Sequence, residues 1–368
     1  MTNETSQAYD IALDLWGEVL DLQQELDEPT KQTFIATTHE GRFRLTTFLD
    51  PATARSPNQL LAAEQRYNVA LTWHALASNV DCDRRCITIP GCSKVSSNRD
   101  FLVSPYITSA SIIDRFCTDD KPITALSIAN LKYLTEAVRW LAALHNTNND
   151  RYFEMTDLAE ASKTSILETQ LRLLTAAYPN HLRGAARAFL DEFLDDDQDL
   201  VLGSADSIRF NLKGPVLTDF DQGHFGQGAY DIACLIRDPV VAILSQNANP
   251  ELGNPGPLID KVWLLYNLAR TTESPCGLEE LNTHLSLQAM NALHGPAAQH
   301  WSDLDDKQRA QVAGWAVAML GTSSLPQRRQ NYISLSSGPL PFARWVVRTG
   351  TRPQHFYTRN SFPTDAGA

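Results

Sequence analysis

Several features that would place this sequence in a special class of protein are missing. No apolar run reaches the roughly 18 residues that a membrane-spanning helix needs, and the first thirty residues are acidic, unlike a secretory signal. Only six of the 368 residues are cysteine, which is typical of a protein from a reducing compartment. These absences predict a soluble, cytoplasmic protein that does not act at a membrane.

Positive charge is also scarce. The chain has 31 Lys and Arg residues against 43 Asp and Glu residues, which gives a net charge of −12. A field of this sign repels nucleic acid, and it favours neutral or cationic small molecules as partners. An anionic nucleotide would therefore need local cations or a metal ion.

The cysteines lack the spacing of a zinc site. Cys82, Cys86 and Cys92 form the only cluster, and no His lies between residues 75 and 144. Zinc sites usually combine closely spaced pairs of Cys or His ligands. We therefore expect free or structural thiols, with zinc as the weaker alternative.

The hydrophobic pattern divides the chain into two parts. Residues 33–50 alternate apolar and polar positions around a turn at Glu40-Gly41, which predicts a β-hairpin. A helix is expected after Ser56-Pro57, and strands are expected near residue 87 and at 101–107. The later pattern predicts long helices, at 126–145, 157–178, 182–194, 258–270, 277–293 and 306–320. We expect an α+β fold with a β-rich lobe at 1–107 and a mainly helical lobe at 108–368, irregular after about 340.

Polar residues suited to phosphate chemistry concentrate at residues 201–221, VLGSADSIRFNLKGPVLTDFD. Phosphoryl transfer needs a carboxylate that accepts a proton and oxygen ligands for Mg²⁺. Asp206, Asn211, Asp219 and Asp221 supply these groups within one short stretch. The alternative is structural, with Asp206 as a helix cap, Asn211 in an Asx-turn and the other aspartates in a turn after a strand.

Three motifs between residues 204 and 233 resemble, in order, those of the aminoglycoside phosphotransferases and the related choline and homoserine kinases. Asp206 and Asn211 are similar to the H-G-D-x-x-x-x-N loop of that family. Leu217 to Asp221 resembles its I-D-[FW]-[DE] strand, and Gly226 to Ala233 resembles its G-D-P-x-x-D-[IL]-A helix start. Leu141 to His145 is similar to its L-A-x-L-H helix end. The resemblance implies a bilobal, protein kinase-like fold.

The resemblance also implies an activity and a role for each residue. The protein would be a kinase that moves the γ-phosphate of ATP or GTP to a hydroxyl of a neutral or cationic metabolite or antibiotic. Asp206 would be the catalytic base, and Asn211, Asp219 and Asp221 would bind Mg²⁺. Asp231 would accept hydrogen bonds from the backbone of the catalytic loop. His145 is expected to be a buried, hydrogen-bonded helix end.

The nucleotide-binding part departs from the family. Ser104 and Tyr106 lie in the segment that resembles the hinge, and Glu64 lies where the family keeps the Glu that orients a Lys. Thr46 occupies the place of that Lys, and Arg44, on the same strand face, is the candidate substitute.

The loop expected to cover the phosphates also departs from the family. No glycine occurs between Gly17 and Gly41, and Lys31 is the one cation of this loop. These departures leave open a second hypothesis, a catalytically inactive, pseudokinase-like binding protein.

Overall fold

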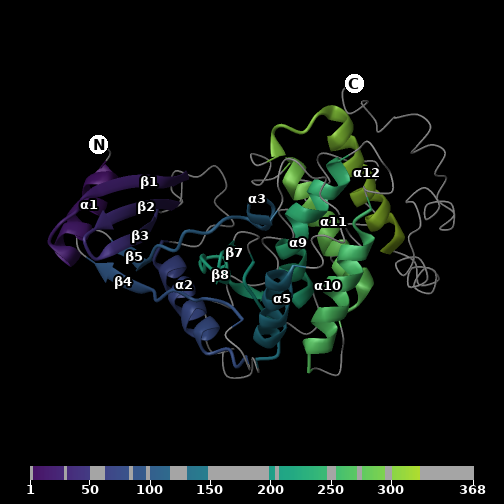
Figure 1. The fold of residues 1–368 in the computed structure, drawn as a ribbon, viewed down its shortest axis with the longest axis horizontal. Helices are drawn as coiled ribbons and strands as arrows, with labels where there is room; N and C mark the ends of the chain where they lie inside the picture. Colours follow the sequence, from purple (N-terminus) through teal and green to yellow (C-terminus); the bar gives the residue numbers. More distant parts are fainter. Residues whose placement is uncertain are drawn as a thin grey trace.

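The computed structural model has a β-rich part followed by a mainly helical part (Figure 1). This arrangement confirms the α+β, bilobal fold that the sequence predicts. The structure describes residues 3–28, 31–49, 63–82, 86–96, 100–116, 131–147, 199–203, 207–246, 254–271, 276–294 and 301–323. The helices expected at 157–178 and 182–194 and the tail after residue 340 lie outside these ranges. No helix of the described residues is long and apolar enough to cross a membrane.

Five antiparallel strands form the N-terminal sheet, in the order β1-β2-β3-β5-β4. They are β1 (Asp21–Glu28), β2 (Lys31–Thr38), β3 (Gly41–Phe48), β4 (Ser93–Ser96) and β5 (Asp100–Pro105). β2 and β3 are the predicted hairpin, and Gly41 in its turn has a φ of 139°, a conformation that favours glycine. The strand expected near residue 87 is reduced to an isolated bridge at Thr88, and the chain forms β4 instead.

One face of this sheet is covered by α1 (Asn3–Trp16). Ala8, Ile11 and Ala12 of the helix pack against alternate residues of the strands, among them Phe34 and Leu45. Because side chains alternate between the two faces of a strand, the residues between these positions point the other way, towards the second lobe. The sequence pattern predicted neither α1 nor β1.

The second lobe is built around helices, and the last three predicted ones are present. They are α10 (Gly256–Ala269), α11 (Leu278–His294) and α12 (Asp306–Ser323), which lie beside α5 (Lys132–His145) and α9 (Gly228–Ser245). The short α3 (Ile112–Phe116) packs on α9, and α2 (Ala63–Ser78) lies between the lobes. Two strand pairs complete it, β6 (Asp199–Val201) with β9 (His224–Gly226) and β7 (Ile208–Asn211) with β8 (Gly214–Leu217). α9 is buried along nearly its whole length, so it forms the centre of this lobe.

The β7–β8 hairpin is held on one side by a residue of the β-rich lobe and on the other by the segment that follows this lobe. Ala110 exchanges two backbone hydrogen bonds of 2.9 Å with Phe210 of β7. Thr88 pairs with β8, because its N–H donates to Pro215 and its carbonyl accepts from Leu217, each at 2.9 Å. These bridges place the end of β8 beneath the sheet, where the two lobes meet.

α2 packs directly on the residues that follow β8. A Cβ atom on Gly223 would lie 1.7 Å from the indole ring of Trp73, so only glycine allows this approach. The ring of His74 meets that of Phe220 edge to face, with 5.2 Å between centroids. The helix and the segment 219–223 therefore form one packed unit.

Gly223→Ala should destabilise the protein by about 1 to 3 kcal/mol, because the added methyl group overpacks a buried aromatic contact. Gly91→Ala is the matched control, since a Cβ at Gly91 meets nothing within 4 Å. The free energy of unfolding in urea measures both. Equal stability of the two variants would contradict the packing of α2 described here.

Candidate functional site

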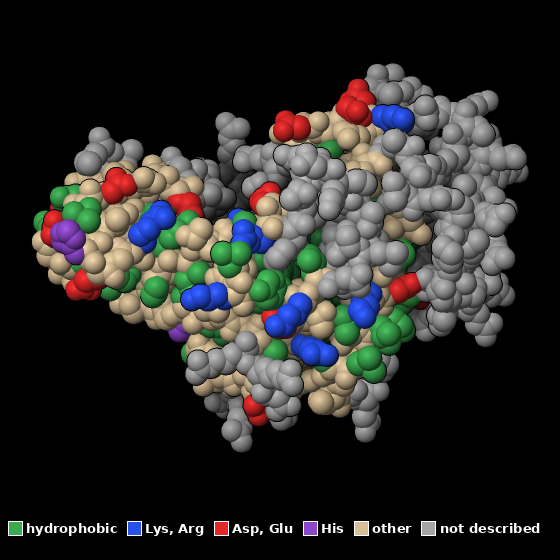
Figure 2. Space-filling model, in the orientation of Figure 1, with side chains coloured by type: hydrophobic (Ala, Val, Ile, Leu, Met, Phe, Trp, Pro, Cys, Tyr) green, Lys and Arg blue, Asp and Glu red, His purple; other side chains and the backbone are tan. Residues whose placement is uncertain are grey.

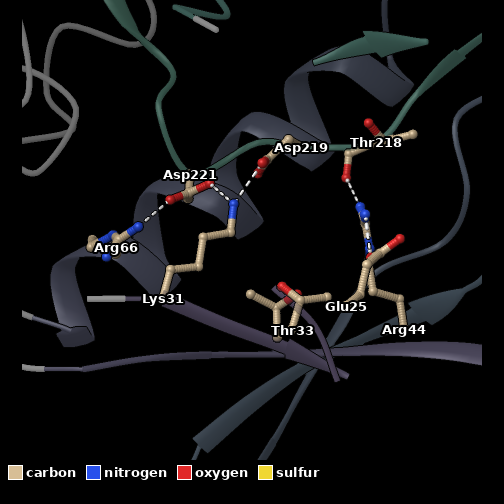
Figure 3. A network of polar contacts seen from close by, with 9 residues as sticks. Glu25, Lys31, Thr33, Arg44, Arg66, Thr218, Asp219 and Asp221 are labelled. Carbon is tan, nitrogen blue, oxygen red and sulfur yellow. Dashed lines mark hydrogen bonds and ion pairs between the residues drawn. The ribbon is translucent and has the colours of Figure 1, made fainter. Parts of the chain in front are cut away.

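The ammonium of Lys31 lies between two carboxylates where the lobes meet (Figure 3). Lys31 is the first residue of β2, and its side chain points away from α1. Its Nζ donates to Oδ2 of Asp219 at 2.5 Å and to Oδ1 of Asp221 at 2.8 Å. The side chains of Lys31 and Asp221 are 8% and 1% exposed. A buried ion pair thus joins the sheet to the segment after β8.

Arg66 of α2 completes the pairing of Asp221. Its Nη2 donates to Oδ2 of Asp221 at 2.5 Å, and its guanidinium lies 4.2 Å from the centre of the Phe48 ring. Both oxygens of Asp221 are therefore bound by cations. Among the described residues, two cations and two carboxylates balance within this buried cluster of Lys31, Arg66, Asp219 and Asp221.

Burial and charge act against each other on the pKa values of this cluster. Burial lowers the pKa of Lys31, but the two carboxylates outweigh it and raise the pKa above its ordinary value. Burial raises the pKa of Asp221, but Lys31 and Arg66 hold it well below its usual range. Burial and the charge of Asp221 raise the pKa of Asp219 to about 6. Asp219 is therefore the first of the two to accept a proton.

The two predicted positions on β3 have different surroundings. Arg44 donates to Oε2 of Glu25 from Nε at 3.0 Å and Nη2 at 2.7 Å, and to the carbonyl of Thr218 at 3.1 Å. Thr46 is buried, and its hydroxyl lies 3.2 Å from that of Thr33. The cation of the sheet that contacts the aspartates is therefore Lys31, on the neighbouring strand. Arg44, the expected substitute, instead binds the backbone just before Asp219.

Glu64 does not orient this ammonium. It lies in the first turn of α2 with an exposed side chain, and the contacts of Lys31 among the described residues are with the two aspartates. Ser104 pairs with Arg44 in the β3–β5 ladder. Tyr106 follows β5, and the guanidinium of Arg42 lies 4.4 Å from the centre of its ring. Ser104 and Tyr106 thus lie where the chain leaves the sheet.

Asn211 is part of a turn. Its Oδ1 accepts hydrogen bonds from the N–H groups of Lys213 at 2.7 Å and Gly214 at 3.1 Å. The β7–β8 ladder runs from Ile208 opposite Leu217 to Asn211 opposite Gly214. At roughly 3.4 Å per residue, Asn211 lies about 10 Å along the hairpin from the end that leads into Asp219. β7 already begins at Ile208, so Asn211 lies in the turn of the hairpin, and its pairing with Asp219 at a metal stays a prediction.

Asp206 lies outside the described residues, but the loop that leads to it is anchored. Asp231 accepts hydrogen bonds from the N–H groups of Leu202 at 2.7 Å and Gly203 at 3.0 Å, which confirms its predicted structural role. His145 is buried, with Nε2 at 3.2 Å from Asp231 and Nδ1 at 2.8 Å from the hydroxyl of Tyr266. The prediction of a hydrogen-bonded helix end at His145 is also confirmed.

Mg²⁺, which the sequence resemblance implies, fits fewer residues than expected. Both oxygens of Asp221 are bound by cations, and Asn211 is bound in its turn. Asp219 has one cationic partner, and 26% of its side chain is exposed. In nucleotide sites Mg²⁺ often takes one or two carboxylates together with phosphate oxygens and water. Asp219 therefore fits as a single protein ligand, although the described residues contain no group of three His, Cys, Asp or Glu suited to a metal.

The cysteine cluster is held as thiols. Cys82 and Cys86 have their sulfur atoms 3.0 Å apart. Burial raises the pKa of Cys86 to about 12, and burial with the charge of Asp219 raises that of Cys92 to about 11. Burial therefore favours the thiol form of both side chains.

No protein-family model and no curated protein sequence matches the chain. A solved structure from Ralstonia eutropha JMP134, provisionally named an aminoglycoside phosphotransferase, is similar with a TM-score of 0.50 and 12% identity, over 89% of this chain and 98% of that one. The chain has the fold of the aminoglycoside phosphotransferases. At such low identity, the likeness of this phosphotransferase fold says nothing about the reaction.

Other solved phosphotransferases give similar values. Spectinomycin phosphotransferase APH(9)-Ia, in complex with ADP and spectinomycin, has a TM-score of 0.49 and 9% identity over 86% of this chain and 98% of its own. The GDP and kanamycin complex of APH(2")-IIia has a TM-score of 0.47 and 12% identity over 88% of this chain and 99% of its own.

The sequence pattern did not predict that Lys31 and Arg66 bind the two aspartates. Lys31 was visible in the sequence as the single cation of its loop, but the phosphotransferase pattern directs attention to β3. Arg66 had no sequence signal, since it lies on a helix whose expected contact was Glu64. In this phosphotransferase fold the cations come from β2 and α2.

Thr46→Lys should lower the free energy of unfolding by about 2 kcal/mol or more. The new ammonium would be buried close to Lys31, and both oxygens of Asp221 are already bound. Thr46→Val, which keeps the shape and loses the hydroxyl contact with Thr33, should stay within about 1.5 kcal/mol of the natural protein. Chemical unfolding measures both, and a Thr46→Lys protein as stable as Thr46→Val would refute the assignment of Lys31 as the local cation.

Proposed function

We propose that the protein is a small-molecule kinase that transfers the γ-phosphate of ATP or GTP to a hydroxyl group. The contact between Lys31 and Asp219 carries this proposal. Phosphoryl transfer depends mainly on positioning the phosphates and neutralising their charge. A buried ammonium beside a partly exposed carboxylate, at the junction of the lobes of a phosphotransferase fold, supplies both kinds of group.

Each residue has a defined part in the proposal. Lys31 would exchange its aspartate partners for phosphate oxygens, and Asp219 would hold Mg²⁺, which when bound supplies positive charge at the transferring phosphate. Asp206 would accept the proton of the acceptor hydroxyl from a loop that Asp231 anchors. Ser104 and Tyr106, next to the junction, would contact the nucleotide.

The acceptor is proposed to be a neutral or cationic small molecule rather than a nucleic acid. The net charge of −12 gives the protein an overall field that disfavours large anions. The face shown in Figure 2 carries Lys and Arg as well as Asp and Glu side chains. On this face the negative charge is therefore mixed with positive charge. We place the protein in the cytoplasm on its cysteine content.

The pairing of Asp221 favours a second function. Lys31 and Arg66 bind both of its oxygens, so the buried cluster is electrically balanced without any ligand. Asn211 is also committed to its turn. A protein that keeps the fold to bind a partner or small molecule, without phosphoryl transfer, would have these features.

The two functions differ in their response to nucleotide. A ligand that binds only the folded state at 100 times its Kd stabilises that state by about 2.7 kcal/mol, so millimolar ATP or GTP with Mg²⁺ should raise the melting temperature of the kinase. Lys31→Met should lose this shift, and Lys94→Met, which removes a cation of the same sheet that pairs with Asp100, should keep it. Lys31→Met is also made with Asp221→Asn, to relieve repulsion between the carboxylates. No shift in the natural protein would support the second function.

Asp206→Asn and Asp219→Asn should affect different steps. Asp206→Asn should lower kcat by about 10² or more with little change in nucleotide affinity, because it removes only the proton acceptor. Asp219→Asn should also weaken Mg²⁺-dependent nucleotide binding. Since Asp219 must be ionised to hold Mg²⁺, this binding should strengthen as the pH rises through about 6 in the natural protein. Calorimetric titration at pH 5 and pH 7.5 checks this, and equal affinity at both would remove Asp219 from the metal site.

A further inference from the structure

Three side chains of α2 meet the segment after β8 along one face of the helix. Arg66 pairs with Asp221, Trp73 covers Gly223 and His74 meets Phe220. Positions 73 and 74 follow position 66 by about two helical turns, so all three lie on one side of the helix. α2 is therefore docked on the residues that bind Lys31.

The charge that α2 brings to this contact is positive. Glu64, which the sequence pattern assigns to the orientation of an ammonium, is exposed. Arg66 cannot orient Lys31 directly, because like charges repel. Asp221 lies between the two cations and offers one oxygen to each, Oδ1 to Lys31 and Oδ2 to Arg66.

We infer that Arg66 is a positioning residue that holds the Lys31 ammonium in place through Asp221. The bond from Arg66 fixes the rotation of the carboxylate, and this rotation sets Oδ1 at 2.8 Å from Lys31 Nζ. The stacking of Arg66 on Phe48 holds the guanidinium itself. The positioning of Lys31 by Arg66 follows from these contacts alone. Only the role of Lys31 in binding phosphates rests on the proposed function.

Without Arg66, the carboxylate of Asp221 is free to turn. The ion pair of Lys31 with Asp221 is then weakened, and the ion pair with Asp219 remains. Asp219 is the more exposed of the two carboxylates. The ammonium should spend more time away from the cluster. A reagent that attacks free amines detects this change directly and needs no nucleotide.

The test measures how fast acetic anhydride modifies Lys31 in the full chain, by mass spectrometry of its peptides. Lys31 should react slowly in the natural protein, with the 81% exposed Lys132 as the internal reference. Arg66→Met should speed modification of Lys31 by about tenfold or more, as expected for the loss of a charged hydrogen bond. Arg66→Lys should restore most of the protection.

Lys94→Met is the matched control. Lys94 also contacts α2, with its ammonium 5.0 Å from the centre of the Tyr67 ring, and its ion pair is with Asp100 rather than Asp221. Its removal should leave the modification of Lys31 unchanged. Melting temperatures are recorded for every variant, so that each is labelled while fully folded.

Two results would overturn the inference. One is a folded Arg66→Met protein in which Lys31 reacts no faster than in the natural protein. The other is faster reaction of Lys31 in Lys94→Met as well, which would indicate general loosening of α2. If Arg66→Met does not fold, Asp221→Asn breaks the same link with little change of shape, and Lys31 protection equal to that of the natural protein would count against the inference.

Measurements of nucleotide binding distinguish failure of the positioning role of Arg66 from failure of the proposed kinase function. Under both proposals, Arg66→Met should weaken nucleotide affinity and Arg66→Lys should recover it, while the Lys31 labelling follows the same order. A protein that binds no nucleotide but still shows this order of labelling retains the positioning role of Arg66 and lacks the kinase activity.

Discussion

The burial of the Lys31 ammonium between Asp219 and Asp221 is the constraint on which the rest of the site depends. An ammonium removed from water needs opposite charge close by, and here that charge comes from residues far away in the sequence. The first residue of β2 must therefore stay against the end of β8. The backbone bridges at Thr88, within the β-rich lobe, and at Ala110, just after it, hold the β7–β8 hairpin in place and keep the two together.

The departures from the family pattern compensate one another. An ammonium that comes from β2 makes a second one on β3 unfavourable, and Thr46 is small and uncharged. With both aspartates close to Lys31, another carboxylate from α2 would add repulsion, and Glu64 points to solvent while Arg66 points inward. Together these exchanges leave a buried cluster without net charge, which costs much less than an unbalanced one.

This balance has a consequence for ligand binding. The lobes are already joined by ion pairs among the described residues, so in the proposed kinase a nucleotide would compete with two carboxylates for Lys31. The negative phosphates of such a nucleotide would attract Lys31, and Asp219, which is partly exposed and more easily protonated than Asp221, is the carboxylate that Lys31 would leave. Lys31 and Arg66 bind the two oxygens of Asp221, so this residue has a structural role. Asp219 and Asp221 thus differ, although both follow β8.

The sequence alone determined the order of the two lobes, the hairpin of β2 and β3, the late helices, and the roles of Asp231 and His145. These features follow from local periodicity and from short motifs that keep their spacing. It did not show that Asn211 lies in the turn of the β7–β8 hairpin, because a strand begins at Ile208, inside the spacing that was expected to be loop. Only the tertiary structure decided that Lys31 and Arg66 bind the aspartates, since ion pairs across more than 150 positions leave no local pattern. Charge neutrality in a buried site specifies how much charge is needed, and the fold decides which residue supplies it.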